Sequence, residues 1–293
     1  MKALREILAR VSSEDLVLRL SALVALIYGT QSEVLEALFV VLAGVGLLAP
    51  ALLRRPLFWL TLLGTSVLIH GMKWFEIDNH KVLFAYWMFT LALGLKGAHL
   101  GRSLGQGARL LIAACFGCGV FWKIYGGQFT DGSFLHLSFL LNGKFEPFTQ
   151  AFSGLTLDQL AHAKASAALF HAGVLNMDAL VLPTTERLGT MALVASYFTI
   201  AIEAAIALTF LLAGRAPHWL RHGLLLTFIV LVYPIATVPG FACILITMGL
   251  ADLGDQKGPL RELYLLAFAF SALSFIPKYL SVYMGVFFDF LSW

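Results

Sequence analysis

Long apolar runs with few charges constrain the fold of this chain more than any other feature of its sequence. Hydrophobic residues make up 59% of the 293 residues and charged residues only 13%, which is about half the charged fraction usual in soluble domains. Since a helix needs about 20 apolar residues to cross a bilayer, about eight spans with short loops would use most of the chain. The sequence therefore predicts an all-α integral membrane protein with a single transmembrane domain over residues 1–293, a bundle of about eight transmembrane helices.

Polar residues divide the chain into the predicted spans. The segment 222–252 is long for one span and short for two, and Pro234 and Pro239 would break any helix there, because proline removes a donor and its ring clashes with the preceding turn. We therefore expect one broken span in this segment. The predicted spans cover about 16–30, 34–52, 56–72, 81–98, 108–125, 189–213, 222–252 and 262–291.

Two further segments are predicted to lie at the membrane surface. The segment 127–187 contains many leucines and a helix-start signal at Thr156–Leu–Asp158, so we expect one or two interfacial or re-entrant helices that cap the bundle. At the N-terminus, apolar residues recur at helical spacing between charged ones, which favours an amphipathic interfacial helix over a cleaved signal peptide. These N-terminal residues are Leu4, Ile7, Leu8 and Val11.

The distribution of lysine and arginine near the span ends predicts the orientation. It favours a multi-pass protein of the cell membrane whose N-terminus is cytoplasmic, so that the loops with His80 and after Lys123 face the periplasm or the exterior. The net charge of +3 is small, and no nucleic-acid partner is expected. The basic residues on the predicted cytoplasmic side are Lys2, Arg5, Arg10, Arg54, Arg55, Lys96, Arg102, Arg109, Arg215 and Arg221.

Lys123 ends the predicted fifth span between Trp122 and Tyr125. Flanking aromatic residues are typical of an interfacial anchor, whose aliphatic stem is buried while its ammonium group reaches water. If the amine instead lies in an apolar pocket, burial favours its neutral form, and the lysine can act as a general base. The residue types alone leave both interpretations open.

Two other polar positions lie in or beside the apolar runs. In Asp78–Asn79–His80, the first two residues suit a helix N-cap, whereas an ionisable His80 at the entrance of a span indicates a functional site. Glu203, at the centre of the sixth span, must be protonated or paired, and Arg19 is its expected partner. Glu203 is either a structural residue or part of the site.

The cysteines and histidines give weaker signals. Cys115 and Cys118 have the spacing of a redox pair, but we favour the interpretation that they are small thiols packed inside a span rich in alanine and glycine. The histidines have no metal-ligand spacing, and no metal site is expected.

Four motifs occur in a fixed order along the chain. They are Asp15–x–x–x–Arg19, Asp78–Asn79–His80, Lys123 followed by Asp131–Gly132, and Glu203. In this order and spacing they resemble the horizontally transferred transmembrane domain family, relatives of the vitamin K-dependent gamma-carboxylase, over a core of about residues 12–252. The match is to the membrane core of that enzyme, and Lys81–Val82–Leu83 stands where an aromatic residue and a leucine often follow the Asn–His pair.

The resemblance implies an enzyme of the lyase or oxidoreductase type that acts on a reduced, vitamin K-like quinone with oxygen, in epoxidation or carboxylation chemistry. Lys123 matches the catalytic base, and Asn79–His80 matches the assisting pair. The alternative is a non-catalytic membrane partner in the maturation, export or tolerance of a secreted peptide. Expected partners are membrane lipid and a secreted peptide, and the expected substrate-binding residues are Asp78, Trp122, Tyr125, Asp131 and Glu203.

Overall fold

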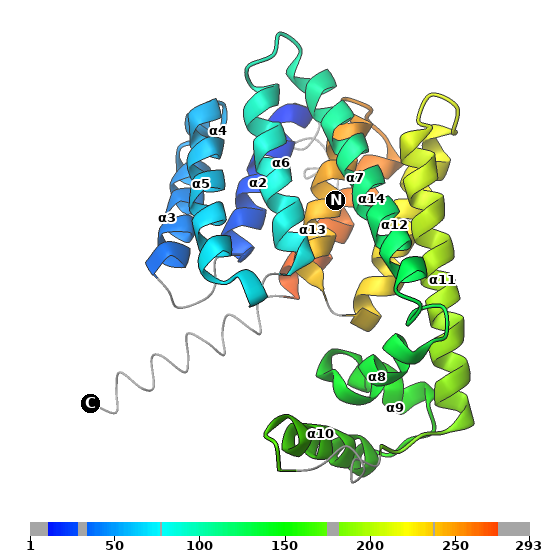
Figure 1. The fold of residues 1–293 in the computed structure, drawn as a ribbon. Helices are drawn as coiled ribbons and strands as arrows, with labels where there is room; N and C mark the ends of the chain where they lie inside the picture. Colours follow the sequence, from blue (N-terminus) through cyan, green and yellow to red (C-terminus); the bar gives the residue numbers. More distant parts are fainter. Residues whose placement is uncertain (1–10, 29–33, 77, 175–181, 237, 275–293) are drawn as a thin grey trace. The chain divides into compact units, whose positions relative to one another are not determined.

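The structure of the protein is a computed structural model that describes residues 11–28, 34–76, 78–174, 182–236 and 238–274 (Figure 1). These ranges contain thirteen α-helices and no strand, which confirms the all-α prediction. The predicted N-terminal interfacial helix lies outside the described residues except for Val11, as does the part of the last apolar run after Ser274. The chain divides into two compact units, which are treated separately below.

The first unit comprises the chain up to Cys115, Thr209–Val230 and the residues from Val238 on. Helices α4 (Pro50–Leu53) and α5 (Pro56–Met72) both begin at a proline, which is pre-organised for the first helical position. Its helices are α2 (Ser13–Tyr28), α3 (Val34–Leu48), α4 (Pro50–Leu53), α5 (Pro56–Met72), α6 (Asn79–Gly94), most of α7 (Leu100–Tyr125), most of α12 (His218–Ala236), α13 (Pro239–Leu253) and α14 (Pro259–Leu273), with a 3₁₀ turn at Trp74–Glu76.

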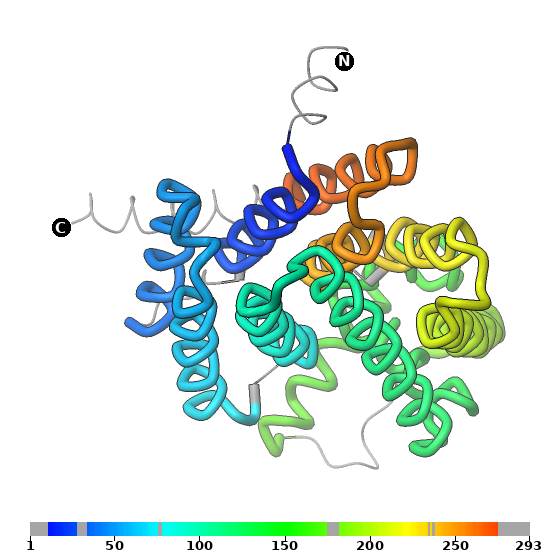
Figure 2. Tube along the Cα trace, turned by 90° about the horizontal axis from the view of Figure 1, so that it is seen from above, coloured from blue at the N-terminus to red at the C-terminus, as the bar shows by residue number. Residues whose placement is uncertain are grey.

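Helix α13 forms the core of the first unit. It packs against α2, α6 and α14 (Figure 2), and every residue from Ala242 to Leu253 is buried. Gly249 permits the close contact with α14, because a Cβ atom there would lie 2.7 Å from the ring and hydroxyl of Tyr264. A helix that is apolar on all sides and buried on all sides is typical of the centre of a bundle.

The second unit comprises Phe116–Leu208 and Leu231–Thr237. Between the end of α7 and α11 (Glu186–Leu211) it contains α8 (Ser133–Leu141), a 3₁₀ turn at Gly143–Phe145, α9 (Glu146–Phe152) and α10 (Leu157–His171) (Figure 1). Thr156 caps α10 in a reciprocal capping box with Gln159, so the predicted helix start is confirmed. Leucine and phenylalanine side chains of α8 form an apolar core with α10 and α11, made of Leu135, Phe139, Leu140, Leu155, Leu160, Leu188 and Ala192.

Two described helices, α7 and α11, are long and apolar enough to cross a membrane. Each has 26 residues, about 39 Å at 1.5 Å per residue, against a hydrocarbon core of about 30 Å. The helices at the first four predicted spans have 15 to 17 residues. They are shorter than the roughly 20 residues that a full crossing needs, so their lengths do not support the predicted count of eight spans. The predicted helix break in 222–252 is confirmed, since α12 ends at Ala236 and α13 begins at Pro239, whereas the expectation that the two pieces make one span stays a prediction.

Candidate functional site

Lys123 and Glu203 form an ion pair within the second unit. Lys123 lies in the last turn of α7, and Glu203 lies in α11. Their side chains are only 16% and 9% exposed. Gly119, one turn before Lys123, leaves room for the carboxylate, because a Cβ atom there would lie 3.3 Å from Glu203 Oε2. The phenyl ring of Phe129 lies over the amine, with 5.1 Å between Lys123 Nζ and the ring centroid.

This geometry bears on both alternatives for Lys123. An interfacial anchor extends its ammonium group into water, whereas this amine has a carboxylate and an aromatic ring as neighbours. The partner of Glu203 also differs from the predicted one, since the carboxylate pairs with Lys123, while Arg19 is an exposed residue of α2. An amine and a carboxylate that form a partly buried ion pair can exchange a proton directly.

The aromatic residues that flank Lys123 lie on the exposed surface of the helix. Trp122 and Tyr125 are exposed and form an aromatic cluster with Phe121, with ring centroids 5.7 to 5.8 Å apart. Such a cluster near a helix end is typical of residues at a membrane–water interface. Their exposure fits the anchor role, and the expectation that both residues bind substrate stays a prediction.

The turn after α7 positions Phe129 and Asp131. Gly127 and Gly132 adopt left-handed conformations with φ of +72° and +78°, which glycine tolerates without strain. Asp131 is exposed, and its Oδ1 accepts a hydrogen bond of 2.8 Å from the Ser133 amide. Hydrogen bonding by the Ser133 side chain and backbone lowers the pKa of the Asp131 carboxyl below its usual value. Asp131 thus stabilises the start of α8.

A groove lies beside this turn. The Phe129 ring stacks on Phe134 with centroids 4.5 Å apart, and Phe134 lines an open groove of about 440 Å³. Phe129 therefore contacts Lys123 and a groove residue at once. The other groove residues combine apolar side chains with amides and hydroxyls, namely Gln128, Ser133, Leu137, Ser138, Leu141 and Asn142.

The Asp78–Asn79–His80 group lies in the first unit. Helix α6 begins at Asn79 with Asp78 at the N-cap position, as predicted, but no side-chain capping hydrogen bond forms. The Asp78 Oδ2 atom instead lies 3.6 Å from His80 Nε2. The His80 ring stacks on Phe241 of α13, with centroids 6.1 Å apart, and Asn79 is exposed.

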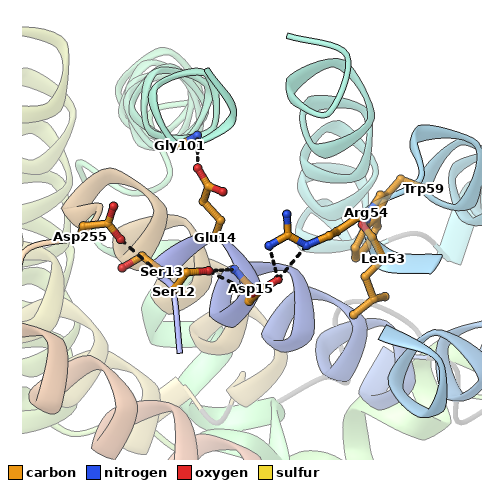
Figure 3. A network of polar contacts seen from close by, with 9 residues as sticks. All are labelled: Ser12, Ser13, Glu14, Asp15, Leu53, Arg54, Trp59, Gly101 and Asp255. Carbon is orange, nitrogen blue, oxygen red and sulfur yellow. Dashed lines mark hydrogen bonds and ion pairs between the residues drawn. The ribbon is translucent and has the colours of Figure 1, made fainter. Parts of the chain in front are cut away.

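Asp15, the first residue of the family-like motifs, takes part in a surface network of the first unit (Figure 3). Its Oδ1 accepts hydrogen bonds from Arg54 Nε and Nη2 at 3.1 and 2.8 Å, and the neighbouring Glu14 accepts one from the Gly101 amide at 2.9 Å. These contacts join α2 to the end of α4 and to the start of α7. The observed role of Asp15 is therefore to connect helices.

A buried polar cluster surrounds Asp252 in the first unit and was not predicted from the sequence. The carboxylate forms ion pairs with Arg109 and with Arg221 Nε, the latter at 2.8 Å, and lies 3.4 Å from His222 Nε2. The His222 Nδ1 atom lies 2.8 Å from the hydroxyl of Tyr264. Apart from the neighbours Arg221 and His222, these residues lie far apart along the sequence. No local spacing therefore indicated the cluster, which connects α7, α12, α13 and α14.

Comparisons with protein-family models, with curated proteins and with solved structures found no match. The resemblance to the carboxylase relatives thus depends on the four motifs alone. Within the described residues, no three His, Cys, Asp or Glu side chains are grouped as metal ligands, and Cys115, Cys118 and Cys243 are not joined in disulfides.

Proposed function

We propose that this chain is a multi-pass protein of the cell membrane with a cytoplasmic N-terminus. The support comes from α7 and α11, of whose apolar windows only 33% and 28% is buried. A core helix of a soluble protein would be mostly buried, because its apolar side chains would otherwise contact water. Lipid contact explains long apolar helices that leave most of their surface uncovered.

We further propose that Lys123 and Glu203 form the proton-transfer pair of a membrane enzyme that resembles the carboxylase core. The observation that carries this proposal is the partly buried ion pair beneath Phe129. Transfer of one proton from Lys123 Nζ to Glu203 Oε1 leaves a neutral amine and a neutral acid. Low polarity favours this step, since it removes two poorly solvated charges. The neutral amine can then accept a proton from an acidic hydroxyl of a lipid-phase substrate.

The residues around the pair fit a reduced quinone. The stacked rings of Phe129 and Phe134 offer an aromatic wall beside the amine, and a planar aromatic ring packs well on such a wall. When bound, a reduced quinone supplies the acidic hydroxyl and the electrons for oxygen. In the chain, Glu203 accepts the proton that Lys123 loses, and the neutral Lys123 Nζ accepts the proton of the substrate. Asn79 and His80 are in the other unit, and we assign them no step.

The experiment compares Lys123→Arg with Lys164→Arg in protein purified into nanodiscs. Lys164 pairs with Glu146 in the same unit but is more exposed, so it is a matched control. Arginine keeps each ion pair but stays charged at any usable pH. Epoxide formation from naphthohydroquinone and oxygen should fall about 10²- to 10⁴-fold in Lys123→Arg and stay unchanged in Lys164→Arg, with equal thermal unfolding.

Full activity in Lys123→Arg would contradict the base assignment. A lipid extract of the purified wild-type protein provides a second measurement, because an enzyme of this kind should co-purify with a quinone. If no quinone co-purifies and no hydroquinone is converted, the enzyme proposal is wrong, and the non-catalytic role in peptide maturation, export or tolerance takes its place.

A further inference from the structure

An open polar cleft lies in the first unit, separate from the Lys123–Glu203 pair. Its volume is about 810 Å³, which is within the range of small-molecule sites. Its walls are the turn before α7, the first turns of α7, the end of α13 and Glu14 of α2. The cleft therefore lies where three helices of this unit begin or end.

One face of α7 directs three hydrogen-bond donors toward this cleft. Arg102, Gln106 and Arg109 are four and three residues apart, so they lie on the same side of the helix, and all three line the cleft. The Cα atoms of the two arginines are about 10.5 Å apart at 1.5 Å per residue, so that both long side chains can reach one anion between them. Arg102 is exposed, and no ion pair or hydrogen bond joins its guanidinium to another described residue.

Arg109 belongs to a group with excess positive charge. It shares the fully buried carboxylate of Asp252 with Arg221, and two guanidinium groups with one carboxylate sum to one positive charge. A guanidinium group has five N–H donors, and Arg109 forms the ion pair through Nε while its side chain stays 39% exposed. The rest of this guanidinium can therefore donate into the cleft, where an anion would balance the charge.

The other acidic residues of the cleft already accept hydrogen bonds from the backbone. Glu14 accepts one of 2.9 Å from the Gly101 amide, and Asp255 accepts one of 3.3 Å from the Ser13 amide (Figure 3). These contacts hold both carboxylates against the backbone, whereas the guanidinium of Arg102 is left for a ligand.

We propose that this cleft binds a phosphate group through Arg102, Gln106 and Arg109. A guanidinium group matches phosphate with two parallel hydrogen bonds, and the oxygens of a phosphate can accept from both arginines and from the amide at once. A carboxylate has only two oxygens and satisfies fewer donors. The phosphate belongs either to an anionic lipid headgroup or to a soluble molecule. The lipid source rests on the proposed membrane location, since the start of α7 would then lie near the headgroups.

Thermal unfolding of the purified full chain in dodecyl maltoside tests the proposal, because a ligand that binds the folded state raises the unfolding temperature. The probes are inorganic phosphate and dioctanoylphosphatidylglycerol, at an ionic strength held constant with chloride. Dioctanoylglycerol has the same acyl chains without the phosphate. At least one phosphate-bearing probe should raise the unfolding temperature in a saturable way, and dioctanoylglycerol should not.

Variants of the cleft are compared with Arg55→Gln. Arg55 is also exposed, and it lies outside the cleft, so its loss changes the net charge equally. Arg102→Gln should weaken the apparent affinity about 10- to 100-fold, as expected for a lost hydrogen bond between charged groups, and Arg55→Gln should leave it unchanged. Gln106→Glu places a negative charge among the donors and should weaken it at least as much. Since Arg102 and Gln106 are exposed, both variants should unfold like the wild type without ligand.

The two probes distinguish the sources of the phosphate. Saturable binding of the lipid alone supports a headgroup, binding of inorganic phosphate alone supports a soluble ligand, and binding of both supports phosphate as the shared group. A missing shift with both probes, an equal shift with dioctanoylglycerol, or equal losses in Arg55→Gln and Arg102→Gln would each overturn the proposal. None of these measurements depends on Lys123, so a failure here is distinct from a failure of the proposed enzyme.

Discussion

At the scale of single residues, the Lys123–Glu203 pair joins two charges that neither helix could bury alone. The sequence identifies both residues, because an ionisable side chain within or beside a long apolar run is rare and must be accommodated. It does not identify the pairing, since the two positions are 80 residues apart in the sequence, and Arg19 was the expected partner of Glu203.

Removing one partner of this pair should cost more than removing both. In Glu203→Leu the ammonium of Lys123 stays partly buried without its partner, and the free energy of unfolding should fall by about 3–5 kcal/mol. In Lys123→Met/Glu203→Leu two apolar side chains replace the pair, and most of that loss should be recovered. Denaturant unfolding in detergent micelles measures both differences.

The pair between Lys164 and Glu146 is the control for this prediction. Its side chains are 29% and 39% exposed, so that Glu146→Leu should change the free energy of unfolding by about 0–1 kcal/mol. A Glu203→Leu variant as stable as Glu146→Leu would show that the Lys123 ammonium finds water, as an interfacial anchor does.

At the scale of helices, the residue at which a helix begins or ends is easier to predict than the neighbours against which the helix packs. Thr156 with Gln159, and Pro239 after a strongly apolar run, mark helix starts through local chemistry that the sequence contains in full. The position of α13 at the centre of the first unit is different. Its apolar sequence resembles that of α11, yet α13 is buried by protein while α11 leaves most of its apolar residues uncovered. Hydropathy measures exclusion from water, and it does not distinguish protein from lipid as the neighbour.

The contact of α13 with α14 should be sensitive to a single methyl group. In Gly249→Ala the new Cβ atom would lie 2.7 Å from the Tyr264 ring and hydroxyl, so the buried ring must shift, and the stability should fall by about 1–3 kcal/mol. Gly223, in α12, has no atom within 4 Å of an added Cβ, and Gly223→Ala should raise the stability by about 0.5–1 kcal/mol through helix propensity. Thermal unfolding of both variants in detergent checks the opposite signs, and equal stability of the two variants would contradict the close packing.

At the scale of the whole molecule, the division into two units was not predicted, because the nearly uniform hydropathy of the sequence does not mark it. The membrane topology can be tested without reference to how the units are arranged. Positions 75 and 150 are separated by the predicted fourth and fifth spans, and two crossings return the chain to the same side of the membrane. Position 99 lies between those spans and should be on the opposite side.

Single cysteines in a background without Cys115, Cys118 and Cys243 provide the measurement. Phe75 is fully exposed, and His99 and Gln150 are also exposed, so substitution at these three positions should leave the core intact. In intact cells, a membrane-impermeant maleimide should label Phe75→Cys and Gln150→Cys, whereas His99→Cys should react only in inverted vesicles.

Two results would contradict the predicted topology, one from this labelling and one from an alkaline wash of the membranes. If positions 75 and 150 are labelled from opposite sides, then one of α6 and α7 does not cross the bilayer. Because α7 is long enough to span at full thickness while α6 has 16 residues, about 24 Å, α6 would be the helix to reassign, as a segment packed against protein rather than a span. If an alkaline wash releases the protein from membranes, the apolar surface of α7 and α11 is covered by protein, and the membrane proposal is wrong.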